Sequence, residues 1–226
     1  MENFELYLKQ LKEFFWKNNI NPDISQIERL SLYASLLYDK NKILNLVSRK
    51  DIDNIVENHI FICSYINHFI PKHCKSFLDI GTGGGLPGIP LAISNPFLKG
   101  ILADSTSKKI AAVQEFIHKL KLSNIKAESI RVEDPEFITK HQNSFDLVVS
   151  RATVPLIMLI RYSLPLVKDK AFLLSLKGGD LSDEIKVAEI KYKINIKKYT
   201  VFELSYKPNN LRNEKEKKLI LLELIK

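Results

Sequence analysis

A glycine-rich segment between a short apolar run and a stretch with helical spacing is the feature that most constrains this chain. The chain has only 8 glycines, and five of them fall between Gly81 and Gly88. Glycine allows backbone dihedrals and close approaches that a Cβ atom would block. The amide groups that open the following helix favour a polar or anionic ligand. This order of strand, glycine loop and helix is typical of a nucleotide-binding α/β domain.

Strands and helices alternate along the chain after residue 75. Apolar runs predict strands at 76–80, 99–103, 125–129, 145–149, 171–176, 196–204 and 217–225. Helical patterns fall at 88–94, 107–121, 135–140, 154–167 and 181–190. This alternation predicts an α/β fold with a mostly parallel, seven-stranded sheet covered on both faces. The last two strands have no long helix between them, so we expect an antiparallel pair at one edge.

Residues 1–70 show a helical pattern instead. An amphipathic stripe predicts a helix over 4–19. Ser25 and Glu28 have the spacing of a capping box that would open a second helix. Asp51 can cap a third helix that continues to about Phe69. We therefore divide the chain into an N-terminal helical extension, 1–70, and an α/β domain, 71–226.

The net charge of +8 is unevenly distributed. Residues 1–70 carry eight Lys/Arg and nine Asp/Glu, which gives −1, whereas residues 186–226 carry eleven basic and five acidic residues, which gives +6. A basic C-terminal part indicates a polyanionic partner, most simply nucleic acid. A solvated lysine-rich surface is the alternative.

The N-terminus and the cysteine content indicate a cytoplasmic protein. The first residues, M-E-N-F-E, lack the basic region and apolar core of a signal peptide. The chain has 2 cysteines, too few for a disulfide framework. His59 and Cys63 lie four residues apart and could form a pair of metal ligands, but the remaining histidines have no zinc spacing, so we expect no metal.

Acidic residues at successive strand ends favour S-adenosylmethionine over NAD. Asp79 comes two residues before Gly81, where a carboxylate suits the cationic amino-acid end of S-adenosylmethionine and would be poorly placed beside a pyrophosphate. Counted from Gly81, the first glycine after the strand, the spacing is G-x-G-x-G and not the G-x-G-x-x-G of dinucleotide sites. Asp104 ends the second strand, where an acid can bind ribose hydroxyls. Glu133 follows the third strand, where adenine can be contacted.

The fourth strand runs into Ser150-Arg151-Ala152, the position that faces the methyl acceptor in class I methyltransferases. The chain has no Asn/Asp-Pro-Pro-Tyr segment for exocyclic amines, and neither cysteine lies after the glycine loop to attack a pyrimidine. An acceptor that needs neither device is left. Guanine N7 is one, because its lone pair lies in the ring plane and carries no proton. Catalysis could then consist mainly of positioning.

Several short motifs together resemble the bacterial ribosomal RNA small subunit methyltransferase G family, also called glucose-inhibited division protein B. The most specific is D-I-G-T-G-G-G-L-P-G-I-P-L-A at 79–92. Further matches are A-D-S at 103–105, R-V-E at 131–133, S-R-A at 150–152, L-K-G at 176–178, and Asn45, Leu46, Arg49 and His59. The similarity runs from about residue 40 to 180.

The resemblance implies a Rossmann-like class I methyltransferase that transfers a methyl group from S-adenosylmethionine to N7 of a guanine (position 527) in 16S ribosomal RNA. It also implies which residues bind the cofactor: Gly81, Leu86, Val132, Glu133 and Arg151. The physical argument adds four more: Asp79, Gly83, Gly85 and Asp104. Arg151 is also a candidate for the acceptor pocket. No catalytic side chain is assigned.

The ends of the chain depart from the family pattern. Residues 60–64 read I-F-I-C-S where the family has F-L-D-S, and 217–220 lack the usual aromatic residue or histidine. Both departures concern RNA contact or packing. Lys177 follows the fifth strand and could contact RNA phosphate. Other basic candidates for the RNA backbone are Arg49, Lys50, Lys108, Lys109, Lys197, Lys198 and Arg212.

We therefore expect a monomeric enzyme that acts on 16S ribosomal RNA or the small ribosomal subunit and does not enter a membrane. Two alternatives stay open. One is a methyltransferase for another RNA, a protein or a small molecule. The other is a non-catalytic RNA-binding factor that keeps the cofactor pocket.

Overall fold

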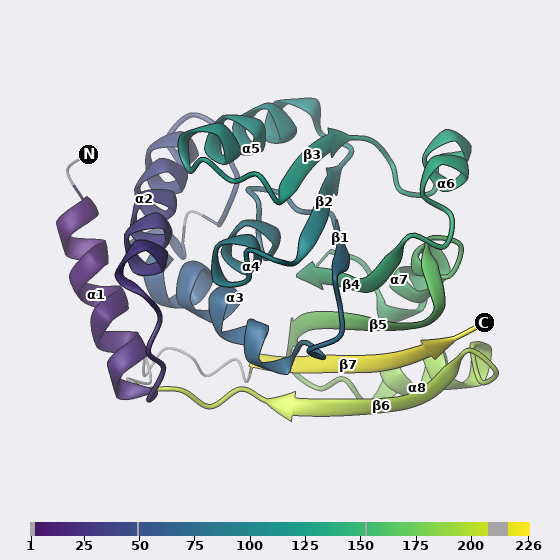
Figure 1. Cartoon of the computed structure of the whole chain (residues 1–226). Coiled ribbons are helices and arrows are strands. Elements are labelled where there is room, and N and C mark those ends of the chain that lie inside the picture. Colours follow the sequence, from purple (N-terminus) through teal and green to yellow (C-terminus); the bar gives the residue numbers. More distant parts are fainter. Residues whose placement is uncertain (1–2, 49, 152, 208–216) are drawn as a thin grey trace.

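A seven-stranded sheet with helices on both faces forms the centre of the computed structural model, which describes residues 3–48, 50–151, 153–207 and 217–226 (Figure 1). The strands are β1 Ser76–Ile80, β2 Lys99–Asp104, β3 Ile125–Ser129, β4 Phe145–Arg151, β5 Val167–Gly178, β6 Ile196–Glu203 and β7 Lys217–Ile225. Their order is β3-β2-β1-β4-β5-β7-β6. Neighbours among β1 to β5 run parallel, and β7 is antiparallel to β5 and β6. The predicted sheet and its antiparallel edge pair are confirmed.

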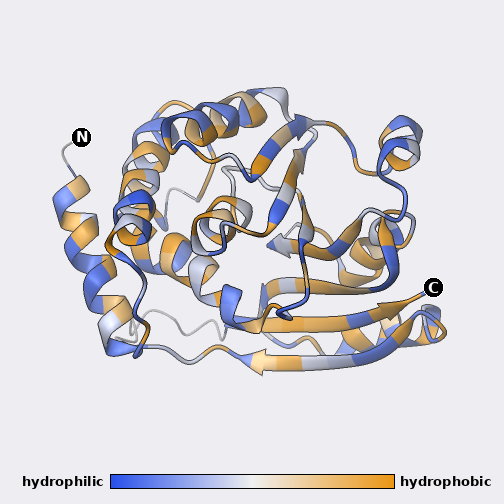
Figure 2. Ribbon diagram, in the orientation of Figure 1, coloured by the Kyte–Doolittle hydropathy of each residue, from blue (hydrophilic) through white to orange (hydrophobic). Residues whose placement is uncertain are grey.

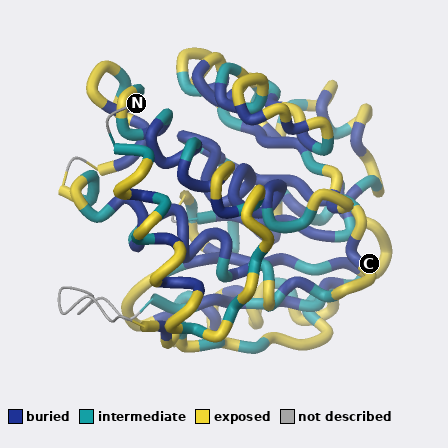
Figure 3. Tube along the Cα trace, turned by 60° about the vertical axis from the view of Figure 1, so that its left-hand side comes forward, coloured by how far each residue is buried: buried dark blue, intermediate teal, exposed yellow. Residues whose placement is uncertain are grey.

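Two hydrophobic cores lie on opposite faces of this sheet, because successive strand side chains point in opposite directions. Phe77 belongs to the core beneath α4 and α5, and Leu78 to the core beneath α6, α7 and α8. These helices are α4 Gly88–Ser94, α5 Ser107–Lys119, α6 Pro135–His141, α7 Leu156–Ser163 and α8 Ser182–Lys191. The central strands are apolar and buried along most of their length (Figures 2 and 3).

The N-terminal helices complete the first of these cores. They are α1 Phe4–Lys17, α2 Ile24–Asn41, and a continuous helical segment over 52–69 that consists of η1 Ile52–Asn54, the π-helix η2 Val56–Phe61, α3 Ile62–Tyr65 and η3 Ile66–Phe69. Leu30, Leu37 and Phe61 are fully buried in the same core as Phe77. Residues 1–70 therefore share a core with the sheet, and their division from 71–226 stays a prediction.

Some helix caps and helix ends differ from the sequence prediction, because a neighbouring residue takes the predicted role. Asp23, not Ser25, caps α2, and its side chain accepts a hydrogen bond from Gln26 N at 2.7 Å. The capping box was wrong because an extended Asp just upstream provides the better acceptor. Asp51 makes no side-chain cap. The helix expected over 154–167 ends at Ser163, because Val167 already pairs with Phe145 in the sheet.

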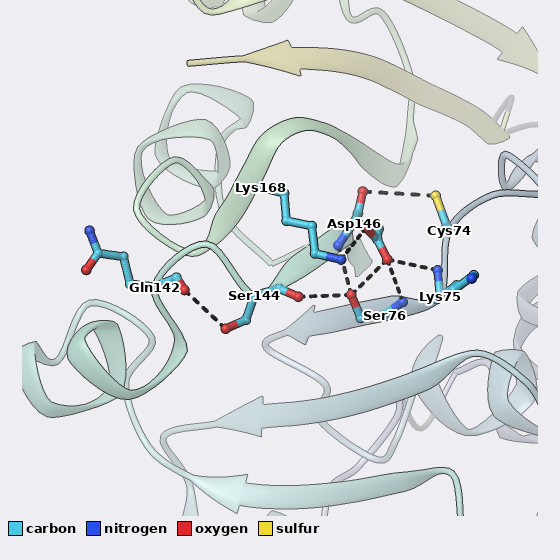
Figure 4. A network of polar contacts seen from close by, with 7 residues as sticks. All are labelled: Cys74, Lys75, Ser76, Gln142, Ser144, Asp146 and Lys168. Carbon is cyan, nitrogen blue, oxygen red and sulfur yellow. Dashed lines mark hydrogen bonds and ion pairs between the residues drawn. The ribbon is translucent and has the colours of Figure 1, made fainter.

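Asp146 connects the amino-terminal ends of β1 and β4 (Figure 4). Its Oδ2 accepts hydrogen bonds from Lys75 N at 2.9 Å and from both Ser76 N and Ser76 Oγ at 3.0 Å. Lys168 Nζ lies 2.7 Å from its Oδ1. Burial alone would raise the pKa of Asp146, but these hydrogen bonds lower it below its ordinary value. The carboxylate therefore stays ionised and holds the two strands together.

No helix in the described residues has the length and apolar content required to span a bilayer.

Candidate cofactor and acceptor site

A pocket of about 340 Å³ lies at the carboxyl ends of β1, β2 and β4. Ligands of open α/β sheets bind at this edge. The lining residues are Leu46, Gly81, Thr82, Gly83, Gly84, Leu86, Asp104, Lys109, Arg151 and Thr153. A larger groove of about 580 Å³ lies between α2 and α5. In this groove Glu115 is already paired with Lys40 and Lys119. We therefore take the first pocket, where several polar groups converge, as the candidate binding site.

The glycine loop forms one wall of the pocket and needs glycine for two reasons. Gly81 and Gly83 have φ angles of +70° and +57°, a left-handed conformation that other residues rarely adopt. A Cβ atom at Gly81 would also overlap the methyl group of Thr153, which packs against this part of the loop. The backbone conformation and packing at Gly81 therefore leave no room for a Cβ atom.

Asp79 lies beneath this loop and is fully buried. Its Oδ2 accepts hydrogen bonds from Thr82 Oγ1 at 2.7 Å and Gly88 N at 2.9 Å. Its Oδ1 is buried without a hydrogen-bond partner in the described part of the chain. Burial raises the pKa of Asp79 to about 7, against the hydrogen bonds from Thr82 and Gly88, which lower it. Asp79 thus braces the loop from below and does not line the pocket, where we had expected it.

Asp104 joins the glycine loop to α5. Its Oδ2 accepts a hydrogen bond from Gly83 N at 3.0 Å, and its Oδ1 accepts one from Thr106 N at 2.8 Å. A carboxylate offers about four acceptor sites, so two bonds leave room for hydroxyl donors of a ligand. Asp104 therefore occupies the place at the end of β2 that the sequence predicted for a ribose contact.

Arg151, the last residue of β4, forms the opposite wall and reaches the N-terminal helical segment. Its Nη1 lies 2.6 Å from His59 Nδ1 and 3.4 Å from Asn58 O. Since a guanidinium only donates, His59 Nδ1 is the acceptor and the imidazole is neutral. Burial, together with the charges of Arg151 and Lys217, lowers the pKa of His59 to about 2. The sequence analysis named His59 as a match to the family pattern, but its contact with Arg151 follows only from the fold.

Comparisons with known proteins identify the family of this chain. A model of the family described as rRNA small subunit methyltransferase G matches residues 26–212. The chain belongs to this family. The Chlorobium limicola protein named ribosomal RNA small subunit methyltransferase G is 44% identical over 165 residues, which cover 73% of each chain. The Chlorobium phaeobacteroides protein of the same name is 42% identical over 182 residues, 80% of each chain.

Solved structures show the same fold at low sequence identity. An O-methyltransferase from Bacillus cereus in complex with SAH superposes with a TM-score of 0.60 at 12% identity, covering 97% of this chain and 99% of that one. A SAM-dependent methyltransferase from Aquifex aeolicus has a TM-score of 0.58 at 16% identity, covering 83% and 98%. Family and fold confirm the prediction of a class I, S-adenosylmethionine-dependent rRNA methyltransferase.

Of the cofactor residues predicted for this family member, five line the pocket: Gly81, Gly83, Leu86, Asp104 and Arg151. Val132 is buried in the second core, and Glu133 is exposed, 3.9 Å from Arg131. The backbone of this segment lies beside β2, because Ile130 N donates to Asp104 O at 3.0 Å. Gly85 lies behind the loop, where a Cβ would press on Ile89.

Thr153, Leu46 and Lys109 line the pocket although the sequence assigned none of them to cofactor binding. Thr153 Oγ1 lies 2.6 Å from Ser150 Oγ, which donates to Ile80 O at 2.9 Å. Thr153 could have been predicted from the sequence, because it follows the predicted site residue Arg151 by only two positions. Lys109 had been named only as an RNA-backbone candidate.

Lys177 does not have the free ammonium group that an RNA contact would use. Its Nζ lies 2.6 Å from Glu184 Oε1 and donates to Val154 O at 3.1 Å, and its side chain is only 12% exposed. We predicted that Lys177 follows the fifth strand, but β5 runs on to Gly178 and includes it, and its partner Glu184 on α8 was not predicted. The pair instead secures the segment after Arg151.

The other described basic residues that we predicted to contact the RNA backbone do not line the pocket. Lys50, Lys108, Lys197 and Lys198 are exposed, and Lys197 lies 3.6 Å from Glu223. Arg49 and Arg212 lie outside the described residues. The described residues contain no cluster of three or more His, Cys, Asp or Glu side chains that could hold a metal. His59 and Cys63 both contact Arg151 instead.

Proposed function

We propose that this enzyme methylates N7 of guanine 527 in 16S ribosomal RNA. The supporting observation is the composition of the pocket. Its described titratable side chains are Asp104, Lys109 and Arg151, and in this proposal the remaining acceptor sites of Asp104 bind the ribose hydroxyls of the cofactor. None of these is placed to act as a general base. An acceptor atom without a proton, such as guanine N7, suits a pocket that offers no base.

The pocket residues fit S-adenosylmethionine. The volume of about 340 Å³ is in the lower part of the range of roughly 300–1,000 Å³ for small-molecule sites. The backbone of Gly81 and Gly83 would approach the amino-acid part, Asp104 would accept from the ribose hydroxyls, and the 132–133 backbone would contact the adenine. Asp79 and Gly85 would shape the loop. The bound cofactor supplies the methyl group on a sulfonium centre.

Arg151 would serve the cofactor and not the guanine. An arginine that reads guanine donates to O6 and N7 together. Such a contact would occupy the N7 lone pair that must attack the methyl group. A cation beside the purine would also oppose the positive charge that develops on it. We therefore assign the Arg151 guanidinium to the cofactor carboxylate, which it can hold through two parallel hydrogen bonds.

We further propose that the protein acts as a monomer in the cytoplasm, on the ribosomal RNA or the small subunit. The basic C-terminal part, +6 over residues 186–226, supports a polyanionic partner. Light scattering of the purified protein at assay concentrations should report a single chain.

Transfer of labelled methyl groups to small subunits that lack this modification tests the proposed reaction. We expect label in the RNA, and chemical cleavage at 7-methylguanosine should map it to position 527. The same particles with the modification already present serve as control and should take up no label. Label at another base atom, or in ribosomal protein, would contradict the proposal.

A further inference from the structure

One edge of the Arg151 guanidinium is held by the helical segment of the N-terminal extension. Among the described residues, its side-chain hydrogen bonds all use Nη1: to His59 Nδ1 at 2.6 Å, Asn58 O at 3.4 Å and Cys63 Sγ at 3.9 Å. The partners belong to η2 and α3, about ninety residues earlier in the chain. Nη1 carries two hydrogens, and these acceptors use both of them.

The opposite edge of the same guanidinium has no partner among the described residues. Nη2 and Nε carry three further hydrogens, and Arg151 lines the pocket beside Gly81 and Thr153. A guanidinium is planar, so fixing Nη1 also fixes the direction of the other two nitrogens. The free edge of Arg151 is the geometry that binds a carboxylate through two parallel bonds.

His59 is suited to hold this guanidinium because it stays an acceptor. The side chain is 4% exposed, and its surroundings keep the imidazole neutral, with the proton on Nε2. Nε2 is buried and has no partner in the described chain. A buried, unpaired N–H is unfavourable, so the contribution of this histidine lies in its other nitrogen.

The segment that carries His59 is itself fixed from the side of β7. Lys217 Nζ donates to Asn58 Oδ1 at 3.1 Å and to Tyr206 OH at 3.4 Å. Ile60 and Phe61, which follow His59, are fully buried. The acceptor therefore belongs to a rigid support, which is what a pre-organised binding group needs.

We propose that His59 is a positioning residue: through Nδ1 it sets the rotation of the Arg151 guanidinium so that the Nε–Nη2 edge faces the cofactor carboxylate. This inference rests on the proposed function, in which Arg151 binds that carboxylate. It makes the N-terminal extension part of the cofactor site, although no described residue of η2 or α3 lines the pocket itself.

Calorimetric affinities of His59 variants for two forms of the cofactor test the proposal. The probes are S-adenosylmethionine and its decarboxylated analogue. His59→Leu removes the acceptor, and we expect at least about 10-fold weaker binding of S-adenosylmethionine with unchanged binding of the analogue. His59→Asn places an amide oxygen near the position of Nδ1, so its affinity should stay within about 3-fold of wild type. In an Arg151→Ala background, His59→Leu should cause no further loss.

The controls separate positioning from general damage. Ile160→Val removes one methylene group from the core on the other face of the sheet, away from Arg151 and the segment that holds it, so it should lower the melting temperature and leave both affinities unchanged. If His59→Leu does not fold, His59→Gln replaces it, since the acceptor of Gln lies near Nε2 and away from Arg151. Equal losses for both cofactor forms, a His59→Asn affinity as poor as that of His59→Leu, or unchanged affinities throughout would overturn the proposal.

The test is independent of the methylated base. If the wild-type enzyme binds S-adenosylmethionine but labels an atom other than guanine N7, the proposed reaction fails. The two cofactor affinities then still decide whether His59 acts through Arg151.

Discussion

Asp146 and Asp79 lie at opposite ends of the parallel strands of the sheet, and their surroundings shift the pKa values of the two carboxyl groups in opposite directions. At the amino-terminal ends of the strands, Asp146 receives hydrogen bonds from Ser76, Lys75 N and Lys168, which lower its pKa. At the carboxyl ends, Asp79 is fully buried, one of its oxygens has no partner in the described chain, and its pKa rises to about 7.

The contrast separates stability from function. The Asp146 network satisfies its polar groups and joins two strands, which stabilises the fold. Near the pocket, Asp79 Oδ1 and His59 Nε2 are buried without a partner in the described chain, while Asp79 Oδ2 and His59 Nδ1 contact the loop and Arg151. Unpaired buried groups beside a pocket are candidates for a functional role, although His141 and Ser175 show that unpaired atoms also occur away from it.

The largest expected effect is loss of cofactor binding in Gly81→Ala. The new Cβ would overlap Thr153, which packs directly against Gly81, and would force a left-handed backbone on alanine. We expect calorimetry to show at least about 1,000-fold weaker binding, or about 4 kcal/mol. Gly179→Ala is the matched control, because Gly179 also has a positive φ of +80° but nothing within 4 Å. Similar affinity losses in both variants would show that backbone strain alone, and not the pocket wall, is responsible.

Asp146→Ala should act on stability alone. Removing the carboxylate leaves the amides of Lys75 and Ser76 and the ammonium of Lys168 without their acceptor. We expect the free energy of unfolding to fall by about 3 kcal/mol in urea titrations, with unchanged affinity for S-adenosylmethionine. Weaker cofactor binding in the folded variant would break the proposed separation between the two ends of the sheet.

His59 should give the protein a loss of stability in acid. The pKa of His59 in the folded protein is about 2, below the ordinary 6.5. Below pH 6.5 His59 is therefore protonated in the unfolded chain but stays neutral in the folded protein. Stability should therefore fall as pH drops below 6.5, by up to about 1.4 kcal/mol per pH unit from this group. Urea titrations between pH 5 and 8 should show this slope reduced in His59→Asn. An identical slope in the variant would mean that another group controls it.

Asp79 should act in the opposite direction over an overlapping range. Its folded pKa of about 7 lies above the ordinary 3.8, so its contribution to stability is complete below pH 3.8 and is lost as pH rises towards 7. Relative to wild type, Asp79→Asn should gain stability between pH 4 and 7, by at most about 1.4 kcal/mol per pH unit. A constant difference between the two proteins across this range would show that Asp79 is ionised in the fold.

The strands and the glycine loop could be predicted because their signals are local. β1, β3 and β7 have the predicted bounds, and so does α4. An apolar run bounded by turn residues encodes a strand within a few residues. The position of Asp104 followed from the same logic, since it ends an apolar run about twenty residues after the loop. Five of the nine predicted cofactor residues line one pocket.

Only the tertiary structure decided which side chains meet across the chain. Arg151 contacts His59, 92 positions away, because the helical segment over 52–69 packs against the sheet next to the end of β4. Lys177 and Glu184 pair for the same kind of reason, through the packing of α8. The burial that puts Asp79 under the loop instead of in the pocket also arises from packing. Sequence alone determined the fold, the family and the cofactor through short-range patterns. The partners and the protonation of the buried polar groups were decided by how distant segments pack together.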